Sequence, residues 1–448
     1  MRKNEPRQKM IDEVIKKTKD EGAKFVNLWF TDILGSLKSF AITAENVEDA
    51  MVNGRGFDGS SIQGFARIDE SDMIALPDPS TFTMLPWRGG ETPAAKMFCD
   101  IQQPNGEPYE FDPRYVLKKN LKEAEDMGLT YYVGPELEYF YFKNSSPNPE
   151  TLDEGGYFDL TPLDVAQDLR RDTVVTLQKM GIKVDYSHHE VAPSQHEIDL
   201  DYTDALTMAD QAMTYRLVVK EIALQHGVYA TFMPKPLPDE NGSGMHVHQS
   251  LFAGENNLFH DSNDDSGLSI ECKQFIAGLL AHAKEFTLVT NQWVNSYKRL
   301  VPGYEAPVYL SWALKNRSDL IRIPGYNPDN PNATRIEYRA PDPTCNPYLA
   351  FAVMLAAGLK GIKEEYQVPE PTTENCYVMT PEIRKERGIG SLPGSLSEAV
   401  KEAENSELLQ ETLGKELHSK LIENKKMEVA SYRKQVTNWE LENYLPIL

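Results

Sequence analysis

Two hydrophobic periods alternate along this chain and predict helices interleaved with strands. Apolar residues recur at helical spacing in four segments, 6–22, 112–127, 163–180 and 203–226. Alternation of apolar and polar residues marks strands at 129–142 and 245–252. Beyond about residue 345 the pattern is mainly helical. The chain is therefore predicted to be an α+β protein.

The first hundred residues differ in pattern from the rest. Residues 25–42 predict two strands around an Asp-Ile-Leu-Gly turn, and a glycine-rich loop follows at 53–72. The stretch IQQPNGEPYEFDPR, residues 101–114, has the proline, glycine and asparagine content of a domain boundary. We predict a small, mostly β domain at 1–105 and a larger domain at 106–448.

Four strands of the larger domain carry ionisable side chains on one face. The side chains that share a face are Glu136 and Glu138; Glu197 and Asp199; His246, His248 and Ser250; and Arg335, Glu337 and Arg339. Each strand taken alone fits the wet face of an antiparallel sheet. Lysine is absent from all four faces, whereas Glu, His and Arg are the residues that bind cations and phosphates. Together the strands predict a concave sheet surface lined with ligands.

The stretch HHEVAPSQHEID, residues 188–199, contains three histidines and three carboxylates. It is not a zincin helix, because Pro193 breaks the helix and the second histidine of HExxH is missing. Glu190 and Glu197 can instead converge from the two sides of a loop. Carboxylate-rich sites with a single histidine prefer hard ions, so the stretch predicts a Mg²⁺ or Mn²⁺ site.

The charge of the chain restricts its ligands. It has 46 basic and 68 acidic residues, a net charge of −22, which disfavours nucleic acids and anionic membranes. A nucleotide would need divalent cations and local arginines, and five arginines lie close together in the sequence: Arg299, Arg317, Arg322, Arg335 and Arg339. No Walker A motif is present. Metals with arginines therefore predict phosphoryl transfer outside the P-loop class.

Other features predict a cytoplasmic location. The four cysteines are far apart and form no CxxC pair, which suits a reducing compartment. No apolar run approaches eighteen residues, and the N-terminus lacks the apolar core of a signal peptide.

Eight stretches resemble type I glutamine synthetases of bacteria and archaea, in the family's order. They are FDGSSIQGF (57–65), GPELEYF (134–140), HHEVAPSQHE (188–197), FMPKP (232–236), NGSGMHVH (241–248), NSYKRLVPGYEAP (295–307), NRSDLIRIP (316–324) and RIEYRAPDPTCNPYLA (335–350). The resemblance implies a β-grasp-like N-terminal domain. It also implies a catalytic domain with a curved antiparallel sheet, a half-barrel, backed by helices.

The resemblance also implies roles for single residues. Two or more Mg²⁺ (or Mn²⁺) ions per site would be held by Glu138, Glu190 and Glu197 and by Glu136, His246 and Glu337. Glutamate would be held by Asn241, Gly242, Arg299 and Arg339, and ATP by His248, Ser250, Arg317, Arg322 and Arg335. Arg317 would contact the transferring phosphoryl group, and Glu305 would be the flap glutamate over the intermediate. Asp58, a turn residue by its local sequence, would serve the ammonium site of an adjacent subunit.

The expected reaction joins ammonia to the side-chain carboxylate of glutamate through a γ-glutamyl phosphate, at the expense of ATP. The expected assembly is a dodecamer of two stacked hexamers with active sites between subunits, and small regulatory proteins are a further class of partner. Arg67 matches the feedback arginine of the Gram-positive-like subgroup, and Tyr377 is expected to stay unmodified. Three alternatives are a γ-glutamyl-amine ligase for polyamines or ethanolamine, a non-catalytic homologue, and a guanidino-kinase-like enzyme.

Overall fold

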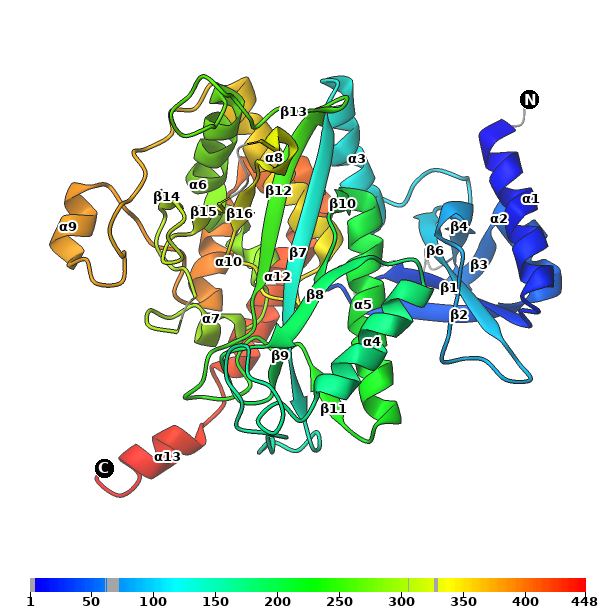
Figure 1. The fold of residues 1–448 in the computed structure, drawn as a ribbon, viewed down its shortest axis with the longest axis horizontal. Helices are drawn as coiled ribbons and strands as arrows, with labels where there is room; N and C mark the ends of the chain where they lie inside the picture. The colour runs from blue at the N-terminus through cyan, green and yellow to red at the C-terminus, as the bar shows by residue number, and fades with distance from the viewer. Residues whose placement is uncertain (1–4, 61, 63–71, 305, 326–328) are drawn as a thin grey trace.

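The computed structural model describes residues 5–60, 62, 72–304, 306–325 and 329–448, and it contains two sheets (Figure 1). The smaller, six-stranded sheet lies near the N-terminus, and its main path runs β2-β1-β6-β4-β3, with β5 paired to β6. Its strands are β1 (Phe25–Thr31), β2 (Leu37–Thr43), β3 (Arg55–Asp58), β4 (Asp72–Pro77), β5 (Thr83–Met84) and β6 (Ala94–Gln102). The helices α1 (Glu5–Asp20) and α2 (Val47–Asn53) pack in the same core as this sheet.

The two faces of this small sheet belong to different cores. Val26 and Leu28 of β1 pack in a core of the N-terminal domain itself. Trp29, between Leu28 and Phe30, points the other way into the main core, where its ring meets Phe98 edge-on at 5.6 Å. Because side chains alternate along β1, one face of the strand packs in the core of the N-terminal domain and the other in the main core, and β1 thereby joins the two domains.

The turn between β1 and β2 fixes this junction. Asn346 donates its side-chain N–H to the carbonyl of Asp32 at 3.1 Å, and Arg216 donates to the carbonyl of Gly35 at 3.1 Å. Gly35 has φ +80°, and a Cβ there would lie 2.9 Å from the Cα of Asn346. Glycine is required by both the backbone conformation and the close approach.

The larger sheet has ten strands in a main path β14-β15-β16-β12-β7-β9-β8, with three short strands paired to β7 and β12. Its long strands are β7 (Thr130–Phe142), β8 (Val184–His189), β9 (Gln195–Leu200) and β12 (Met245–Ala253). Its short strands are β10 (Thr203–Asp204), β11 (Tyr229–Thr231), β13 (Asn256–Asn257), β14 (Trp312–Leu314), β15 (Ile321–Ile323) and β16 (Ile336–Tyr338). All its pairings are antiparallel except β14 with β15.

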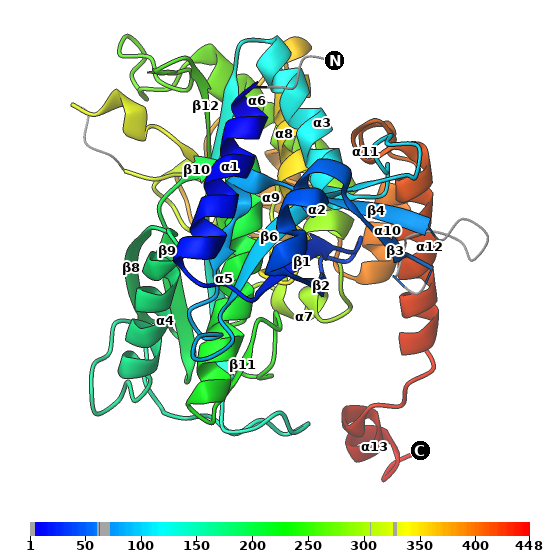
Figure 2. The same cartoon turned by 90° about the vertical axis from the view of Figure 1, so that its right-hand side faces the viewer.

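Helices cover one face of this curved sheet, as Figures 1 and 2 show. They include α3 (Pro113–Asp126), α4 (Gln167–Lys179), α5 (Ala205–Gln225), α6 (Ile270–Thr290) and α8 (Pro347–Lys363). The covered face is apolar: Leu137, Ile198 and Val247 are each at most 1% exposed. The expected β-grasp domain and helix-backed half-barrel are thus confirmed, while the boundary at residue 105 stays a prediction.

The remaining helices are α7 (Ser296–Arg299), α9 (Pro381–Glu386), α10 (Leu396–Glu404), α11 (Glu407–Leu413), α12 (Lys415–Tyr432) and α13 (Asn438–Tyr444). Helix α13 projects away from the body of the molecule (Figure 1). Among the described residues, no helix combines the length and apolar character needed to cross a bilayer. The predicted helix at 163–180 begins only at Gln167, since Asp164 accepts the N–H of Ala166 at 3.1 Å in a turn that competes with helix.

Candidate functional site

Strand register brings the predicted polar residues together on the face that the helices leave open. Glu136 on β7 lies opposite His246 on β12 and opposite Asp199 on β9. Glu138 lies opposite Glu197 by the same pairing. Directly opposite residues of antiparallel strands have Cβ atoms about 4.5–5.5 Å apart, so their side chains share one site.

Glu136, His246 and Glu337, which were predicted as metal ligands from the sequence, lie together and form the first group of potential ligands. Their ligand atoms all lie within 4.8 Å of one another. His246 Nδ1 is 3.1 Å from an oxygen of Glu136 and 3.7 Å from an oxygen of Glu337. Three donors of this kind, one imidazole and two carboxylates, fit a divalent cation.

Glu190 and Glu197 converge across the loop between β8 and β9, as predicted, but the third member of their group is His188. The two ring nitrogens of His188 lie 3.6 Å from Glu190 and 3.7 Å from Glu197. Glu138, predicted as the third ligand, is adjacent. Its Oε2 accepts the N–H of Gly244 at 2.8 Å and the side-chain N–H of Gln195 at 3.0 Å.

The electrostatics of these acids fit a cation. Burial, together with the charges of Asp199 and Glu136, raises the pKa of Glu197 well above its usual range. Burial raises the pKa of Asp199 to about 6, and its Oδ1 is buried without a hydrogen-bond partner among the described residues. Burial opposes ionisation of Glu136 too, but the charge of His248 and hydrogen bonds from two histidines hold its pKa well below normal. Divalent cations would offset this crowded negative charge.

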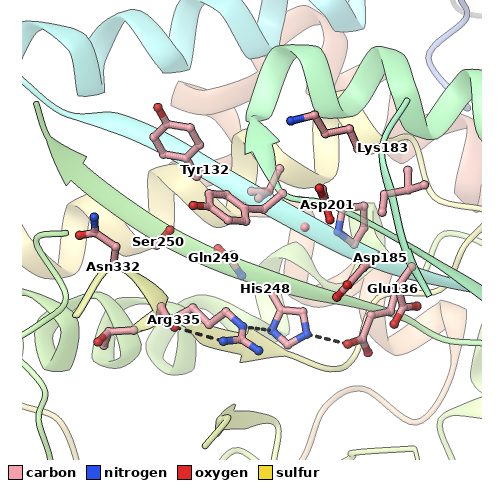
Figure 3. Close-up of a pocket in the computed structure, with 18 of the residues that line it drawn as sticks. Tyr132, Glu136, Lys183, Asp185, Asp201, His248, Gln249, Ser250, Asn332 and Arg335 are labelled. Atoms are coloured by element: carbon pink, nitrogen blue, oxygen red, sulfur yellow. Dashed lines mark hydrogen bonds and ion pairs between the residues drawn. The ribbon is translucent and has the colours of Figure 1, made fainter. Parts of the chain in front are cut away.

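Arginines border the acids on the β15–β16 side. Arg322 and Arg339 both donate through Nε to Glu337, the latter at 3.0 Å. Arg335 donates to Nδ1 of His248 at 3.3 Å, and the other ring nitrogen of His248 lies 2.7 Å from Glu136 (Figure 3). Arg317 is exposed, and its backbone carbonyl accepts from Arg339.

A cavity of about 710 Å³ adjoins the first group (Figure 3). Three of the predicted ATP residues, His248, Ser250 and Arg335, line it. Further lining residues were not singled out from the sequence: Tyr132, Lys183, Asp185, Tyr186, Asp201, Tyr202 and Asn332. Its size is that of an ordinary small-molecule site.

The four residues predicted for glutamate line a second, much smaller cavity of about 30 Å³ beside Glu138 and Glu190. This volume holds about one water molecule. Arg299 is 3% exposed, and its guanidinium donates to the carbonyls of Ala340 (2.7 Å), Pro341 (3.2 Å) and Arg339 (3.2 Å). The cavity as it stands is too small for glutamate.

Other predicted residues lie elsewhere. Asp58 is exposed at the end of β3 in the N-terminal domain, away from β7 and β12 in Figure 1. Glu305 and Arg67 lie outside the described residues. The hydroxyl of Tyr377 donates to the carbonyl of Ala306 at 2.9 Å.

Sequence reasoning missed Gln195, which joins two parts of the site. Its amide donates to Glu138 and, at 3.1 Å, to the carbonyl of Gly242, while its oxygen accepts the N–H of Ala192 at 3.1 Å. It is 1% exposed. The available signal was a polar residue, Gln195, within the ligand-rich stretch 188–199, but only the folded structure shows which groups it contacts.

Comparison with known proteins agrees with this geometry. Residues 22–104 match the family described as glutamine synthetase, beta-Grasp domain, and residues 110–444 match glutamine synthetase, catalytic domain. The chain is 53% identical over 440 residues to glutamine synthetase of Methanosarcina mazei, covering 98% of each chain, and 50% identical to that of Thermotoga maritima, covering 97% of this chain and 100% of the relative.

A solved structure described as a GmaS/ADP complex superimposes with a TM-score of 0.88 at 31% identity, covering 97% of this chain and 99% of that one. The sequence matches span both domains and nearly the full length of the relatives. This chain belongs to the glutamine synthetase family.

Proposed function

We propose that the open face of the larger sheet is the active centre at which this chain makes glutamine from glutamate, ammonia and ATP. Family membership makes the chain an enzyme, a glutamate–ammonia ligase that depends on ATP and a divalent metal. The observation that carries the placement is the convergence of Glu136, His246 and Glu337 beside the 710 Å³ cavity. We assign the site residues as follows.

Mg²⁺ or Mn²⁺, two or more per site, would be held by the two groups of acids with their histidines. Glu136, His246 and Glu337 form one set, and Glu190 and Glu197, with Glu138 or His188, form the other. Bound metals would neutralise phosphate oxygens and so lower the barrier to phosphoryl transfer. Arg322 and Arg339 donate to the two oxygens of Glu337 and so orient its carboxylate.

The nucleotide would occupy the large cavity. His248, Ser250 and Arg335 line it, and Arg322, which is not among its lining residues, pairs with Glu337. The structure described as a GmaS/ADP complex has the same fold, which supports nucleotide binding by this chain. Arg317, which is exposed, is assigned to the transferring phosphoryl group, since a guanidinium matches phosphate oxygens in geometry and charge.

Glutamate would bind through Asn241, Gly242, Arg299 and Arg339, with its side-chain carboxylate toward the nucleotide. That carboxylate is a poor electrophile, so transfer of the γ-phosphoryl group of ATP to it gives the γ-glutamyl phosphate that ammonia can attack. Asp58 of an adjacent subunit would bind ammonium and accept its proton. Glu305 would close the site against water, which would hydrolyse the intermediate.

A shared site requires an oligomer, and we infer a cytoplasmic dodecamer of two stacked hexamers. Asp58 is exposed at the end of β3, and β3 lies away from β7 and β12 in Figure 1, which suits a contribution to a neighbour. Helix α13 projects outward with Trp439 and Tyr444 60% and 45% exposed, which suits burial against another subunit. All four cysteines are buried and unpaired, as in a reducing compartment. We also propose that the activity is regulated by feedback through Arg67 and by small regulatory proteins.

The reaction is tested by coupled measurement of ADP release with Mg²⁺, ATP and glutamate, comparing ammonium with methylamine, ethanolamine and putrescine. Turnover with ammonium alone, giving glutamine, is expected. Turnover with an organic amine instead would reassign Asp58 and the reaction to the amine ligases.

The shared site is tested by mixing subunits. Asp58→Ala and Arg339→Ala rings are each expected to be nearly inactive, whereas co-assembled rings regain part of the activity through interfaces in which both residues are native. No recovery in rings shown to contain both subunits would place Asp58 outside the site.

A further inference from the structure

A separate cavity of about 270 Å³ lies between the two domains. None of its lining residues lines the nucleotide pocket or the small cavity beside Glu138. Lys96 on β6 and Asp78 after β4 come from the N-terminal domain, and Arg114 on α3 and Asp210 on α5 come from the catalytic domain. Met180 and Ile182, just after α4, form an apolar part of the wall. The volume equals that of about nine water molecules.

The ammonium of Lys96 is the unusual feature of this cavity. Lys96 is 6% exposed, and its Nζ lies 4.5 Å from the ring centre of Phe98 and 5.6 Å from that of Trp29. Among the described residues its Nζ makes no hydrogen bond and no ion pair, only these contacts with aromatic rings. Burial lowers the pKa of this amine to about 8, against the opposing charge of Asp210. A buried ammonium with unused donors is costly unless a ligand accepts from it.

Two carboxylates in the same wall retain capacity to accept. Asp210 accepts from Arg114 Nε (3.1 Å), from Arg114 Nη2 (3.0 Å) and from the hydroxyl of Tyr348 (2.6 Å). Asp78 accepts from Arg114 Nη2 (2.8 Å) and from the N–H and hydroxyl of Ser80 (3.1 and 2.7 Å). Each carboxylate therefore uses three of roughly four lone-pair sites. An unused cationic donor and two incompletely used carboxylates thus face one cavity.

We propose that this cavity binds a small zwitterion with an aliphatic body, of the size of valine. Its carboxylate would accept from Lys96, its ammonium would donate to Asp78 or Asp210, and its aliphatic part would contact Met180 and Ile182. A phosphate or other dianion would be repelled by the two aspartates, and a simple cation would leave Lys96 unpaired. A net-neutral ligand with both charges satisfies both sides.

Such a ligand would join the two domains, because its two charges bind to different ones. Lys96 belongs to β6 of the N-terminal sheet, whereas Asp210 belongs to α5 of the catalytic domain. Binding therefore stabilises the docked arrangement, and the midpoint of thermal unfolding rises with ligand concentration. This inference is independent of the proposed residue roles at the active centre.

The charge requirement is tested by calorimetric titration of the complete enzyme with three probes of matched shape: valine, 3-methylbutanoate and isobutylamine. Valine is expected to bind saturably, and each analogue at least about tenfold more weakly, because each leaves one charged group of the cavity unpaired. Equal binding of valine and 3-methylbutanoate, or no binding of valine, would overturn the proposal.

Variants locate the bound valine. Lys96→Met removes the ammonium, and Thr207→Trp fills the mouth of the cavity at an exposed position that leaves the core intact. Both should lower valine affinity at least about tenfold. Lys118→Met, which removes a neighbouring lysine that pairs with Asp100 outside the cavity lining, should bind like the native protein, as should Arg339→Ala. Binding lost in Arg339→Ala but kept in Thr207→Trp would move the ligand to the glutamate cavity and end the proposal.

Discussion

Replacing Glu337 by glutamine probes the centre of the proposed metal site with almost no change of shape. Glu337 is 2% exposed, and it sits 3.7 Å from His246 while accepting from Arg322 and Arg339. Burial opposes its ionisation, but His248, His246 and Arg339 outweigh burial and hold its pKa below the usual value. The native side chain therefore carries a full negative charge at neutral pH, and glutamine removes it.

The size of the effect follows from these contacts. Loss of a group that merely supports a metal ligand weakens metal binding about 10–100-fold, so loss of a ligand charge should weaken it at least about 100-fold, or about 2.7 kcal/mol. Glutamine can also accept from only one of the two arginines. The unpaired guanidinium should lower the free energy of unfolding by about 3 kcal/mol, as when one partner of a buried ion pair is removed.

The measurements are Mn²⁺ titration by calorimetry, ADP release at saturating substrates, and ring assembly by size-exclusion chromatography. Glu337→Gln should lose Mn²⁺ affinity and nearly all activity while its rings stay assembled. Glu285→Gln is the matched control, since this partly buried carboxylate also pairs with a histidine but lies on α6. Native Mn²⁺ affinity and activity in Glu337→Gln would remove this residue from the metal site.

Two further predictions concern other contacts. Asp78 has a folded pKa of about 2 against 3.8: burial opposes its ionisation, but Arg114, Ser80 and Lys118 together outweigh burial. The pair thus stabilises the fold above pH about 4, and its contribution is lost as the pH falls through about 2. Asp78→Asn should therefore lower the free energy of unfolding, measured by chemical denaturation, by about 2 kcal/mol at pH 7 and by about 1 kcal/mol at pH 3. The same loss at both pH values would contradict this. Gln195→Leu keeps the side-chain volume but removes the bonds to Glu138 and Gly242, so KM for glutamate should rise about tenfold or more; an unchanged KM would assign Gln195 to the loop alone.

The sequence predicted the acids of the site because strand periodicity is a local property. Alternation along 245–252 placed His246 and His248 on one face and Val247 on the other, and the structure has this arrangement. It could not predict which strands are neighbours. That β12 lies between β7 and β16, so that His246 meets both Glu136 and Glu337, follows from pairings between segments about one hundred residues apart.

His188, which groups with Glu190 and Glu197, also could not be predicted from the sequence, although these residues are close together in the chain. His188 and Glu190 are two residues apart and would share a face of any regular strand. Glu197 joins them because Ser194, at φ +61°, turns the chain back and puts Glu197 directly opposite His188. Sequence spacing alone could show that Glu190 and Glu197 can converge, but not that a histidine would stand between them.

The orientation of Glu138 depends on a still less local feature. Its neighbours Leu137 and Tyr139 fix which face it occupies, and that much is readable from the strand pattern. Its rotamer is set by Gly244, just before β12, and by Gln195, the first residue of β9, and these two strands lie on either side of β7. Because Glu138 and Gln195 both line the 30 Å³ cavity, a widening of it that admits glutamate and moves Gln195 would change the hydrogen bonds of Glu138 as well, and would couple substrate binding to the geometry of the metal site.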